Sequence, residues 1–473
     1  MTAFDLIVIG AGSGGLSIGL SMHELGFRVL LIEKEEQAIG GECLNTGCVP
    51  SKALIHVTRL IQEARRAEAF GMHASGKPDF ERVKQYINER IEHIRSHENA
   101  DYFRHQGMGV VIGTAHFTGP NSVAVSGQVY TAKRIVIATG SQPIELQVPG
   151  VEQVKWYDNR TIFSMPTLPA RLLVVGGGPI AVELSQAFHR LGSQVTVVQA
   201  GDGILEKESP EVSRLLLERL SLEGIAFRLQ TKLINFPSAH TATLENKSGQ
   251  QSQLDFDAVL VAIGRQIDVT GLQPEAAGIQ TESGRLKLDA HLRTTNPRVY
   301  AIGDVTGQLY FSHTPEMQAP ILINNFLSPF KQKVDYRNFS WVTFTDPEVA
   351  TFGLTEAQLQ QQGIRYEKIV YAFTEDDRAV VDDYTYGKLW LYLSPGRSLL
   401  SKRKLLGGSV VAPQAGEMIQ DLIMANTFDL GAGAIRQKIY PYPVASRVSK
   451  MALLDQLKRE IPAWAKAILR RLY

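Results

Sequence analysis

The sequence predicts an α/β protein with two Rossmann-like dinucleotide-binding domains and a third region at its C-terminal end. Two observations predict the paired domains: an apolar run that leads into a glycine-rich turn occurs at residues 4–15 and again at residues 171–183. Such an internal duplication indicates that one chain binds two dinucleotides. The third region is predicted by a shift in composition from about Asn338 onward.

The length and composition are those of an ordinary globular protein. The 473 residues suffice for about three domains, and 44% of them are hydrophobic and 21% charged. A formal net charge of +1 argues against nucleic acid as the main partner. The chain enters its first strand by Phe4 without a signal peptide, and no apolar stretch approaches the roughly 18 residues of a membrane span. We therefore expect a cytoplasmic protein.

The first glycine-rich turn has the context that a dinucleotide site requires. An apolar run at Phe4–Ile9 is expected to form a strand, and residues 16–25 follow with helical periodicity. Glycines at the intervening turn let the backbone approach a pyrophosphate at the helix N-terminus. Glu33 ends the next apolar run, where an acid can bind the ribose hydroxyls of an adenosine.

Both cysteines of the chain lie in one short stretch. Cys43 and Cys48 are separated by Gly47, which lets the chain turn, so the two thiols can approach closely enough to form a disulfide. Ser51 and Lys52 then lead into an apolar-periodic run, which places the pair near a helix N-terminus. The positive end of that helix favours a thiolate. In a cytosolic protein a close pair is more often catalytic than structural.

The stretch Gly40-Gly41-Glu42-Cys43-Leu44-Asn45-Thr46-Gly47-Cys48-Val49-Pro50-Ser51-Lys52 resembles the redox motif of the FAD-dependent pyridine nucleotide-disulfide oxidoreductases. That family includes dihydrolipoamide dehydrogenase, glutathione reductase and mercuric reductase. The resemblance covers about residues 3 to 455 and is strongest toward mercuric reductase. It implies that Cys43 is the interchange thiol that attacks the substrate, that Cys48 lies against the flavin, and that Lys52 lies near the flavin N5.

The resemblance also implies that the first site holds FAD. The segment that ends in Ala138-Thr139-Gly140 is similar to the family segment that returns to the flavin, and Asp304 resembles the aspartate that binds its ribityl or phosphate part. The residues expected to bind FAD are therefore Gly10, Gly12, Gly15, Glu33, Lys34, Gly41, Lys52, Ala138, Thr139, Gly140, Gly303 and Asp304.

The second turn is expected to bind the nicotinamide cofactor. Pro179 suits the first turn of its helix, because its missing N–H costs nothing there. Gln199 stands where a carboxylate would select NAD, and Ala181 also resembles NADPH sites, although residues 200–203 offer no arginine for a phosphate. We expect NADPH or NADH, with NADPH favoured. The expected cofactor-binding residues are Gly176, Gly178, Ala181, Gln199 and Gly264.

Two further positions bear on catalysis. Glu183 matches the family glutamate that pairs with the motif lysine, here Lys52. Tyr442 and Arg447 occupy the places of the histidine and glutamate with which family disulfide reductases move protons. A tyrosine with a pKa of about 10 is a poor proton shuttle at pH 7. Mercuric reductases also carry a tyrosine in this region, but they use a C-terminal cysteine pair that this chain lacks. Tyr442 is accordingly either catalytic or part of an interface.

The C-terminal segment 451–473 predicts two helices separated at Pro462, with an apolar stripe and basic residues beside it. Contact with a membrane surface is one interpretation, and packing on a dimer is the favoured one.

Together these observations predict a homodimeric FAD-dependent NAD(P)H oxidoreductase that passes electrons through the flavin to a Cys43–Cys48 disulfide. The acceptor is expected to be a disulfide, a metal ion or a small oxidant, and no resident metal site is predicted. The alternative is a redox sensor or electron-relay flavoprotein with little turnover. The expected catalytic residues are Cys43, Cys48, Lys52, Glu183 and Tyr442. The expected domains are an FAD-binding domain (1–148, continued by the central part 269–337), an NAD(P)-binding domain (149–268) and an α+β dimerisation domain with a helical extension (338–473).

Overall fold

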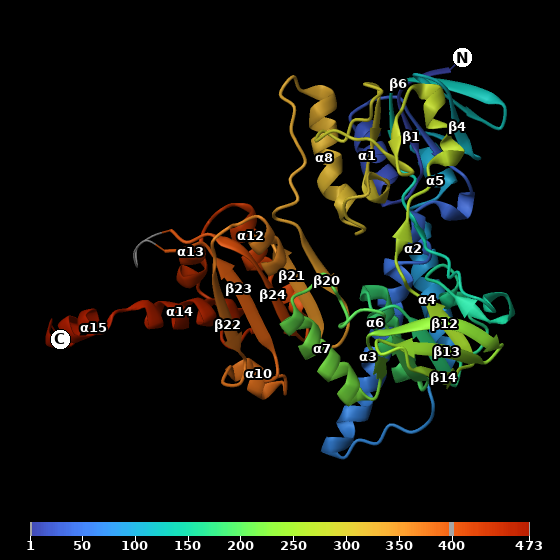
Figure 1. The fold of residues 1–473 in the computed structure, drawn as a ribbon. Coiled ribbons are helices and arrows are strands. Elements are labelled where there is room, and N and C mark those ends of the chain that lie inside the picture. The colour runs from blue at the N-terminus through green and yellow to red at the C-terminus, as the bar shows by residue number, and fades with distance from the viewer. Residues whose placement is uncertain (1, 397–401, 473) are drawn as a thin grey trace. The chain divides into compact units, whose positions relative to one another are not determined.

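The computed structural model describes residues 2–396 and 402–472 (Figure 1). The chain divides into two compact units, of which the first comprises 1–176, 187–198 and 232–334 and the second comprises 177–186, 199–231 and 335–473. The domain boundaries expected from the sequence remain predictions. None of the described helices has the length and hydropathy that crossing a membrane requires.

The first unit is built on a seven-stranded sheet whose centre is parallel. Four strands lie in the order β3-β2-β1-β6, β19 pairs with β6, and β5 and β4 extend the sheet antiparallel. The bounds are β1 Thr2–Ile9, β2 Val29–Glu33, β3 Gly109–Ile112, β4 Ala115–Gly119, β5 Ser122–Val125, β6 Gln128–Ile137 and β19 Val299–Ala301. The strand expected at 4–9 is thus confirmed, and the apolar run that Glu33 ends forms β2.

The two faces of β1 contact two different apolar cores, because successive side chains of a strand point to opposite faces. Leu6 and Val8 pack with α1 (Ser13–Glu24) and α8 (Thr314–Leu327), which lie side by side in Figure 1. Ile7 and Ile9 pack in a second core with side chains of β4 and β5. Burial on both faces explains why the strand reads as a continuous apolar run.

The remaining helices of this region follow the redox stretch. Apart from the connections between the helices, residues 53–105 are helical. The bounds are α2 Gly41–Asn45, α3 Cys48–Arg66, α4 Phe80–Arg95 and α5 Ala100–His105.

A second parallel sheet of the first unit carries the second glycine turn. Its strands β10, β9, β15 and β8 are parallel neighbours in that order, and β12, β13 and β14 form a separate sheet. The bounds are β8 Trp156–Tyr157, β9 Arg171–Val175, β10 Gln194–Val198, β12 Thr231–Ser238, β13 Thr241–Asn246, β14 Gln251–Asp255 and β15 Ala258–Val261, with the short strands β7 Gln142–Pro143, β11 Ala226–Arg228, β16 Arg265–Gln266, β17 Thr281–Glu282 and β18 Arg285–Leu286. Helix α6 (Pro179–Leu191) begins at Pro179, as predicted.

The second unit contains a five-stranded antiparallel sheet in the order β20-β21-β24-β23-β22, with helices packed on it. The strands are β20 Ser340–Thr343, β21 Glu348–Gly353, β22 Glu367–Ala372, β23 Lys388–Leu393 and β24 Leu405–Ala412. The helices are α7 Pro210–Glu223, α9 Glu356–Gln361, α10 Asp377–Val381, α11 Ala415–Met418, α12 Gln420–Thr427, α13 Ala432–Gln437, α14 Val448–Glu460 and α15 Ala463–Leu472. This is the α+β third region that the sequence predicted.

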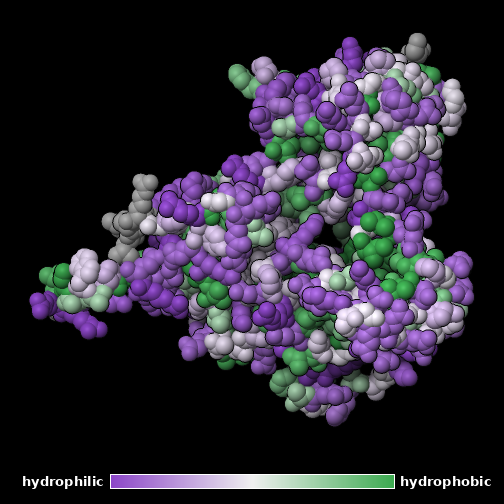
Figure 2. All heavy atoms as spheres, in the orientation of Figure 1, coloured by the Kyte–Doolittle hydropathy of each residue, from purple (hydrophilic) through white to green (hydrophobic). Residues whose placement is uncertain are grey.

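The C-terminal tail forms the two predicted helices, separated at Pro462, while Tyr473 lies outside the described residues. Apolar and polar residues lie beside one another along α15 (Figure 2). Trp464 is 67% exposed and Leu472 is 78% exposed. The apolar stripe of α15 is therefore largely uncovered among the described residues, and its partner remains a prediction.

A buried carboxylate joins α7 to the sheet of the second unit. Glu208, just before α7, accepts hydrogen bonds from Trp341 Nε1–H at 2.5 Å and from the Thr351 hydroxyl at 2.6 Å. Burial raises the pKa of Glu208, and the hydrogen bonds from Thr351 and Trp341 oppose that rise. Because the folded-state pKa of this acid is raised, its contribution to stability is fully present below the unfolded pKa and is lost as pH rises through the folded pKa.

We predict that Glu208→Gln flattens this pH dependence. The glutamine can accept from Trp341 and donate to Thr351, whose hydroxyl also contacts Ser409 Oγ at 2.8 Å. Urea unfolding between pH 4.5 and 8 should show wild type losing stability relative to the variant as pH rises, by about 1.4 kcal/mol for each unit of raised pKa. The exposed Glu417→Gln is the matched control. Parallel pH profiles for wild type and Glu208→Gln would contradict the prediction.

Candidate active site

The turn between β1 and α1 is so tight that only glycine fits at two of its positions. Gly10 has φ of +103°, and a Cβ there would lie 2.4 Å from the carbonyl oxygen of Ala138. A Cβ on Gly15 would lie 1.8 Å from the carbonyl oxygen of Gly10. The N-terminus of α1 therefore lies directly at the end of β1, which is the arrangement that the glycine spacing predicts.

Glu33 at the end of β2 directs its carboxylate to the same turn. Its Oε2 accepts a hydrogen bond from the Ala11 N–H at 2.7 Å, and its Oε1 accepts one from the Lys34 N–H at 2.8 Å. Burial raises the pKa of Glu33, and these N–H donors oppose the rise.

The redox stretch begins directly on this turn. A Cβ on Gly41 would lie 2.6 Å from the Cα of Gly12, and the Gly40 N–H donates to the Ala11 carbonyl at 2.9 Å. The contact requires glycine at position 41, which also has a positive φ of +65°. It brings two segments that the sequence analysis treated separately into one site.

The two thiols meet because the chain reverses between α2 and α3. Cys43 lies in α2 and Cys48 is the first residue of α3. A Cβ on Gly47 would lie 2.7 Å from the Glu42 carbonyl oxygen, so a larger residue would open this reversal. Both sulfurs are unbonded, and the Cys43 and Cys48 side chains share a hydrogen bond. The pair lies at a helix N-terminus, as predicted.

The two thiols titrate as a pair. The hydrogen bond to Cys48 is the largest cause that raises the pKa of the Cys43 thiol, burial raises it further, and Ser312 opposes the rise. Cys48 lies at the N-terminal end of α3, where the helix dipole favours a negative charge. When the pair loses one proton, the thiolate is therefore favoured on Cys48 and the remaining proton on Cys43.

A serine that the sequence analysis missed contacts the pair. Ser312, in the loop before α8, has its Oγ 2.9 Å from the Cys48 Sγ. The two residues are 264 positions apart, and no local pattern marks such a contact. A hydroxyl at this distance can donate a hydrogen bond to a Cys48 thiolate.

Asp304 follows β19 in the same unit. Its Oδ2 accepts a hydrogen bond from Ser141 Oγ at 2.6 Å and lies 3.6 Å from Arg265 Nε. Burial raises the pKa of Asp304, and Ser141 and Arg265 oppose the rise. Ser141 follows Ala138-Thr139-Gly140, so two segments expected to bind FAD are joined by a hydrogen bond.

Comparison with known families accounts for this combination of segments. The model of the pyridine nucleotide-disulphide oxidoreductases matches residues 4–320, and the model of their dimerisation domain matches residues 339–453. The chain belongs to the pyridine nucleotide-disulphide oxidoreductases. The predicted family, fold class and oxidoreductase activity are thereby confirmed, and the second match fits the predicted homodimer.

Individual members of this family are similar over nearly the whole chain. The chain is 30% identical over 455 residues to a mercuric reductase of Staphylococcus aureus, covering 95% of this chain and 82% of that protein. It is 32% identical over 452 residues to a dihydrolipoyl dehydrogenase of Thermus scotoductus, covering 94% and 96%. Among solved structures, the Cu(II) complex of the HOCl-induced flavoprotein disulfide reductase RclA from Escherichia coli is 27% identical with a TM-score of 0.83, covering 96% of this chain and 99% of that chain.

The residues of the first unit fit the FAD on which this oxidoreductase family depends. The glycine contacts leave its turn free of side chains, and Glu33 and Asp304 provide acceptors at two of the segments around it. The assignment of individual ligands remains a prediction.

The second glycine turn of this oxidoreductase repeats the geometry of the first. Gly176 has φ of +115°, and a Cβ there would lie 2.3 Å from the Ala262 carbonyl oxygen. Gly264 also has a positive φ, of +123°. A Cβ on Gly178 would meet nothing within 4 Å, whereas Ala181 is fully buried.

Five predicted site residues lie in the second unit: Gly178, Ala181, Glu183, Gln199 and Tyr442. Glu183 Oε1 accepts a hydrogen bond from the Phe344 N–H at 2.8 Å. Gln199 Nε2 donates to Glu206 Oε1 at 2.8 Å. Tyr442 is 69% exposed, and the Arg447 guanidinium lies 5.5 Å from its ring centroid. Since Lys52 belongs to the first unit, its pairing with Glu183 remains a prediction, as does catalysis by Tyr442.

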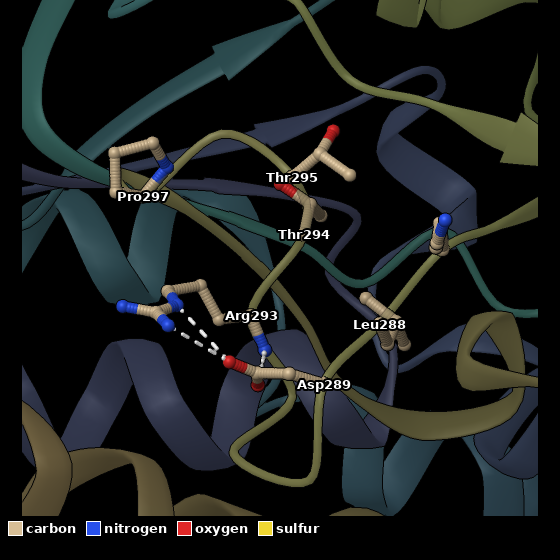
Figure 3. A pocket seen from close by; sticks show the side chains of 7 residues that line it. Leu288, Asp289, Arg293, Thr294, Thr295 and Pro297 are labelled. Carbon is tan, nitrogen blue, oxygen red and sulfur yellow. Dashed lines mark hydrogen bonds and ion pairs between the residues drawn. The ribbon is translucent and has the colours of Figure 1, made fainter.

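A surface pocket of about 510 Å³ lies on the first unit of this flavoprotein. Figure 3 shows the side chains that line it. Its polar groups are satisfied locally: Arg293 donates to Asp289, and the Thr294 hydroxyl donates to the carbonyls of Asn296 and Val299. None of the predicted site residues lines it. Its lining residues are Lys287, Leu288, Asp289, Arg293, Thr294, Thr295 and Pro297.

We predict that Ser312→Ala raises the pH at which the Cys48 thiolate forms, by about one pH unit, because a hydrogen bond to a charged group contributes about 1.5 kcal/mol or more. The measurement is a pH titration of thiolate absorbance in the reduced protein. Ser312→Thr keeps the hydroxyl and should titrate like wild type. Equal shifts in both variants would show that packing, and not the hydroxyl, is responsible.

Proposed function

We propose that the protein is a homodimeric, cytoplasmic NAD(P)H oxidoreductase whose Cys43–Cys48 pair delivers electrons to a metal-ion substrate. The observation that carries the proposal is the contact between the two thiols at the N-terminus of α3, directly against the dinucleotide turn. When bound, FAD supplies the ring that accepts a hydride from the nicotinamide cofactor. The chain holds the thiols and sets their charges.

The two cysteines have different roles in this proposal. Cys48 carries the negative charge, which the α3 N-terminus and the Ser312 hydroxyl stabilise. Cys43 keeps the proton longer and meets the substrate, as the family resemblance implies. Reoxidation of this thiolate–thiol pair forms one sulfur–sulfur bond and releases two electrons and one proton.

The choice of a metal ion rests on proton demand. Reduction of a disulfide substrate must deliver protons to the thiols that leave, and family disulfide reductases use a histidine for this. This chain has Tyr442 there, with Arg447 beside its ring. Reduction of a metal ion needs no such donor. The similarity to mercuric reductases and to RclA, whose solved structure is a Cu(II) complex, supports the same choice.

The tyrosine at the place of the family histidine also favours the second candidate function, a redox sensor with little turnover. Without a proton-moving histidine, the reduced pair would persist and its state could be read by a partner. Steady turnover with a soluble acceptor separates the two functions.

We expect wild type, reduced anaerobically by NADH or NADPH, to show the long-wavelength absorbance of a thiolate beside oxidised flavin, and Cys48→Ala to lack it. Oxidation of the nicotinamide should then be at least tenfold faster with Cu(II) or Hg(II) than with lipoamide or glutathione disulfide, with quinones as the third acceptor class. A colourless protein, or turnover confined to disulfides, would refute the proposal. Reduction without turnover on any acceptor would favour the sensor.

The nicotinamide preference depends on a carboxylate that the sequence analysis did not weigh. Gln199 at the selecting position is consistent with NADPH, but it is hydrogen-bonded to Glu206. A carboxylate beside this position repels a 2′-phosphate and tolerates a 2′-hydroxyl. The structure therefore supports NADH more than the sequence alone did.

We predict that Glu206→Gln raises kcat/KM for NADPH relative to NADH by roughly tenfold, because it removes a negative charge near the expected phosphate. Steady-state kinetics with both cofactors and one acceptor provide the ratio. Lys207→Gln, a charge change at the adjacent exposed residue, is the control. A ratio unchanged by Glu206→Gln would place the determinant elsewhere.

A further inference from the structure

One guanidinium in the first unit contacts both the redox stretch and the flavin-site aspartate. Arg265, in β16, donates from Nη2 to a carboxylate oxygen of Glu42 and to the Ser141 carbonyl at 3.0 Å. Its Nε donates to Ser141 Oγ at 2.7 Å. Only 16% of the Arg265 side chain is exposed. A shielded cation with this many bonds is held in one place.

The second part of the network reaches Asp304. Ser141 Oγ donates to Asp304 Oδ2 at 2.6 Å, and the same oxygen lies 3.6 Å from Arg265 Nε. Two carboxylates, Glu42 and Asp304, therefore share one cation. Removal of either carboxylate leaves the Arg265 guanidinium with one anionic partner, and this changes how strongly it binds the other carboxylate.

Glu42 matters because of its position beside the sulfur pair. It directly precedes Cys43 in α2, which has only five residues. A helix this short is not stable by its own hydrogen bonds, so tertiary contacts fix its position. The described contacts that fix α2 from outside include the approach of Gly41 to Gly12 and the ion pair between Glu42 and Arg265.

We propose that Arg265 and Glu42 are positioning residues that make flavin retention and the placement of Cys43 depend on each other. Glu42 holds the guanidinium beside Ser141 and Asp304, and the guanidinium holds α2 in place. The inference rests on the proposed function for the flavin and the redox pair. The inference adds an ion-pair connection between α2 and Asp304, which the glycine turns and the cysteine spacing do not predict.

The test uses Glu42→Gln in the flavin-loaded protein, because this variant removes the charge and keeps the side-chain shape. Flavin release, followed by the fluorescence of free FAD in mild denaturant, should become roughly tenfold faster, since a charge-assisted hydrogen bond is lost. The long-wavelength absorbance of the reduced protein should fall in the same variant. Asp289→Asn, which breaks the exposed Arg293 pair in Figure 3, is the matched control and should change neither quantity.

A double variant separates positioning from general destabilisation. Arg265→Met should reproduce both effects, and Glu42→Gln combined with Arg265→Met should be no worse than Arg265→Met alone, because both remove one interaction. Additive effects, or a Glu42→Gln protein with normal flavin release and normal absorbance, would overturn the inference. If wild type itself lacks the absorbance, the proposed function fails instead. Circular dichroism identifies any variant that does not fold, and the milder Glu42→Gln then decides alone.

Discussion

The site depends on one reversal of the chain, in which Gly47 lies against the carbonyl of Glu42. This contact turns Cys48 back onto Cys43 and at the same time starts α3 at Cys48. The contact between the two sulfurs and the start of α3 thus arise from the same few residues. The pairing of Gly41 with Gly12 then places the reversal on the dinucleotide turn. Backbone sterics, more than side-chain recognition, bring the redox pair to the first site.

This geometry also determines which of the two sulfurs carries the negative charge. A pair of thiols that shares a proton at a helix N-terminus separates into a favoured thiolate and a thiol, and Ser312 adds a hydroxyl on the thiolate side. In the proposed function, Tyr442 stands where family disulfide reductases carry their proton-donating histidine. The proposal therefore combines the sulfur pair that stores electrons with the loss of the residue that delivers protons. Such a combination suits an acceptor that takes electrons without protons.

The local elements of this fold could be predicted because their signals are local. A strand, a glycine turn and a helix appear in sequence order twice, and Pro179 and Pro462 mark helix boundaries that the structure has. The cysteine spacing and the periodicity after Lys52 placed the pair near a helix N-terminus correctly.

The contacts that tune the site could not be predicted in this way. Ser312 reaches Cys48 from 264 positions away, and the Arg265–Glu42 pair joins residues 223 positions apart. Glu206 is close to Gln199 in sequence, but only the fold of the loop makes it a hydrogen-bond partner. Such pairs leave no periodicity, because each depends on how separate strands and loops come together.

The central claim is that the sulfur pair stores electrons in addition to those of the flavin. Anaerobic reductive titration tests it most directly, with wild type and Cys43→Ser compared at equal flavin content. The account predicts that wild type consumes twice the reducing equivalents that Cys43→Ser consumes before its absorbance stops changing. Equal consumption by the two proteins would contradict it.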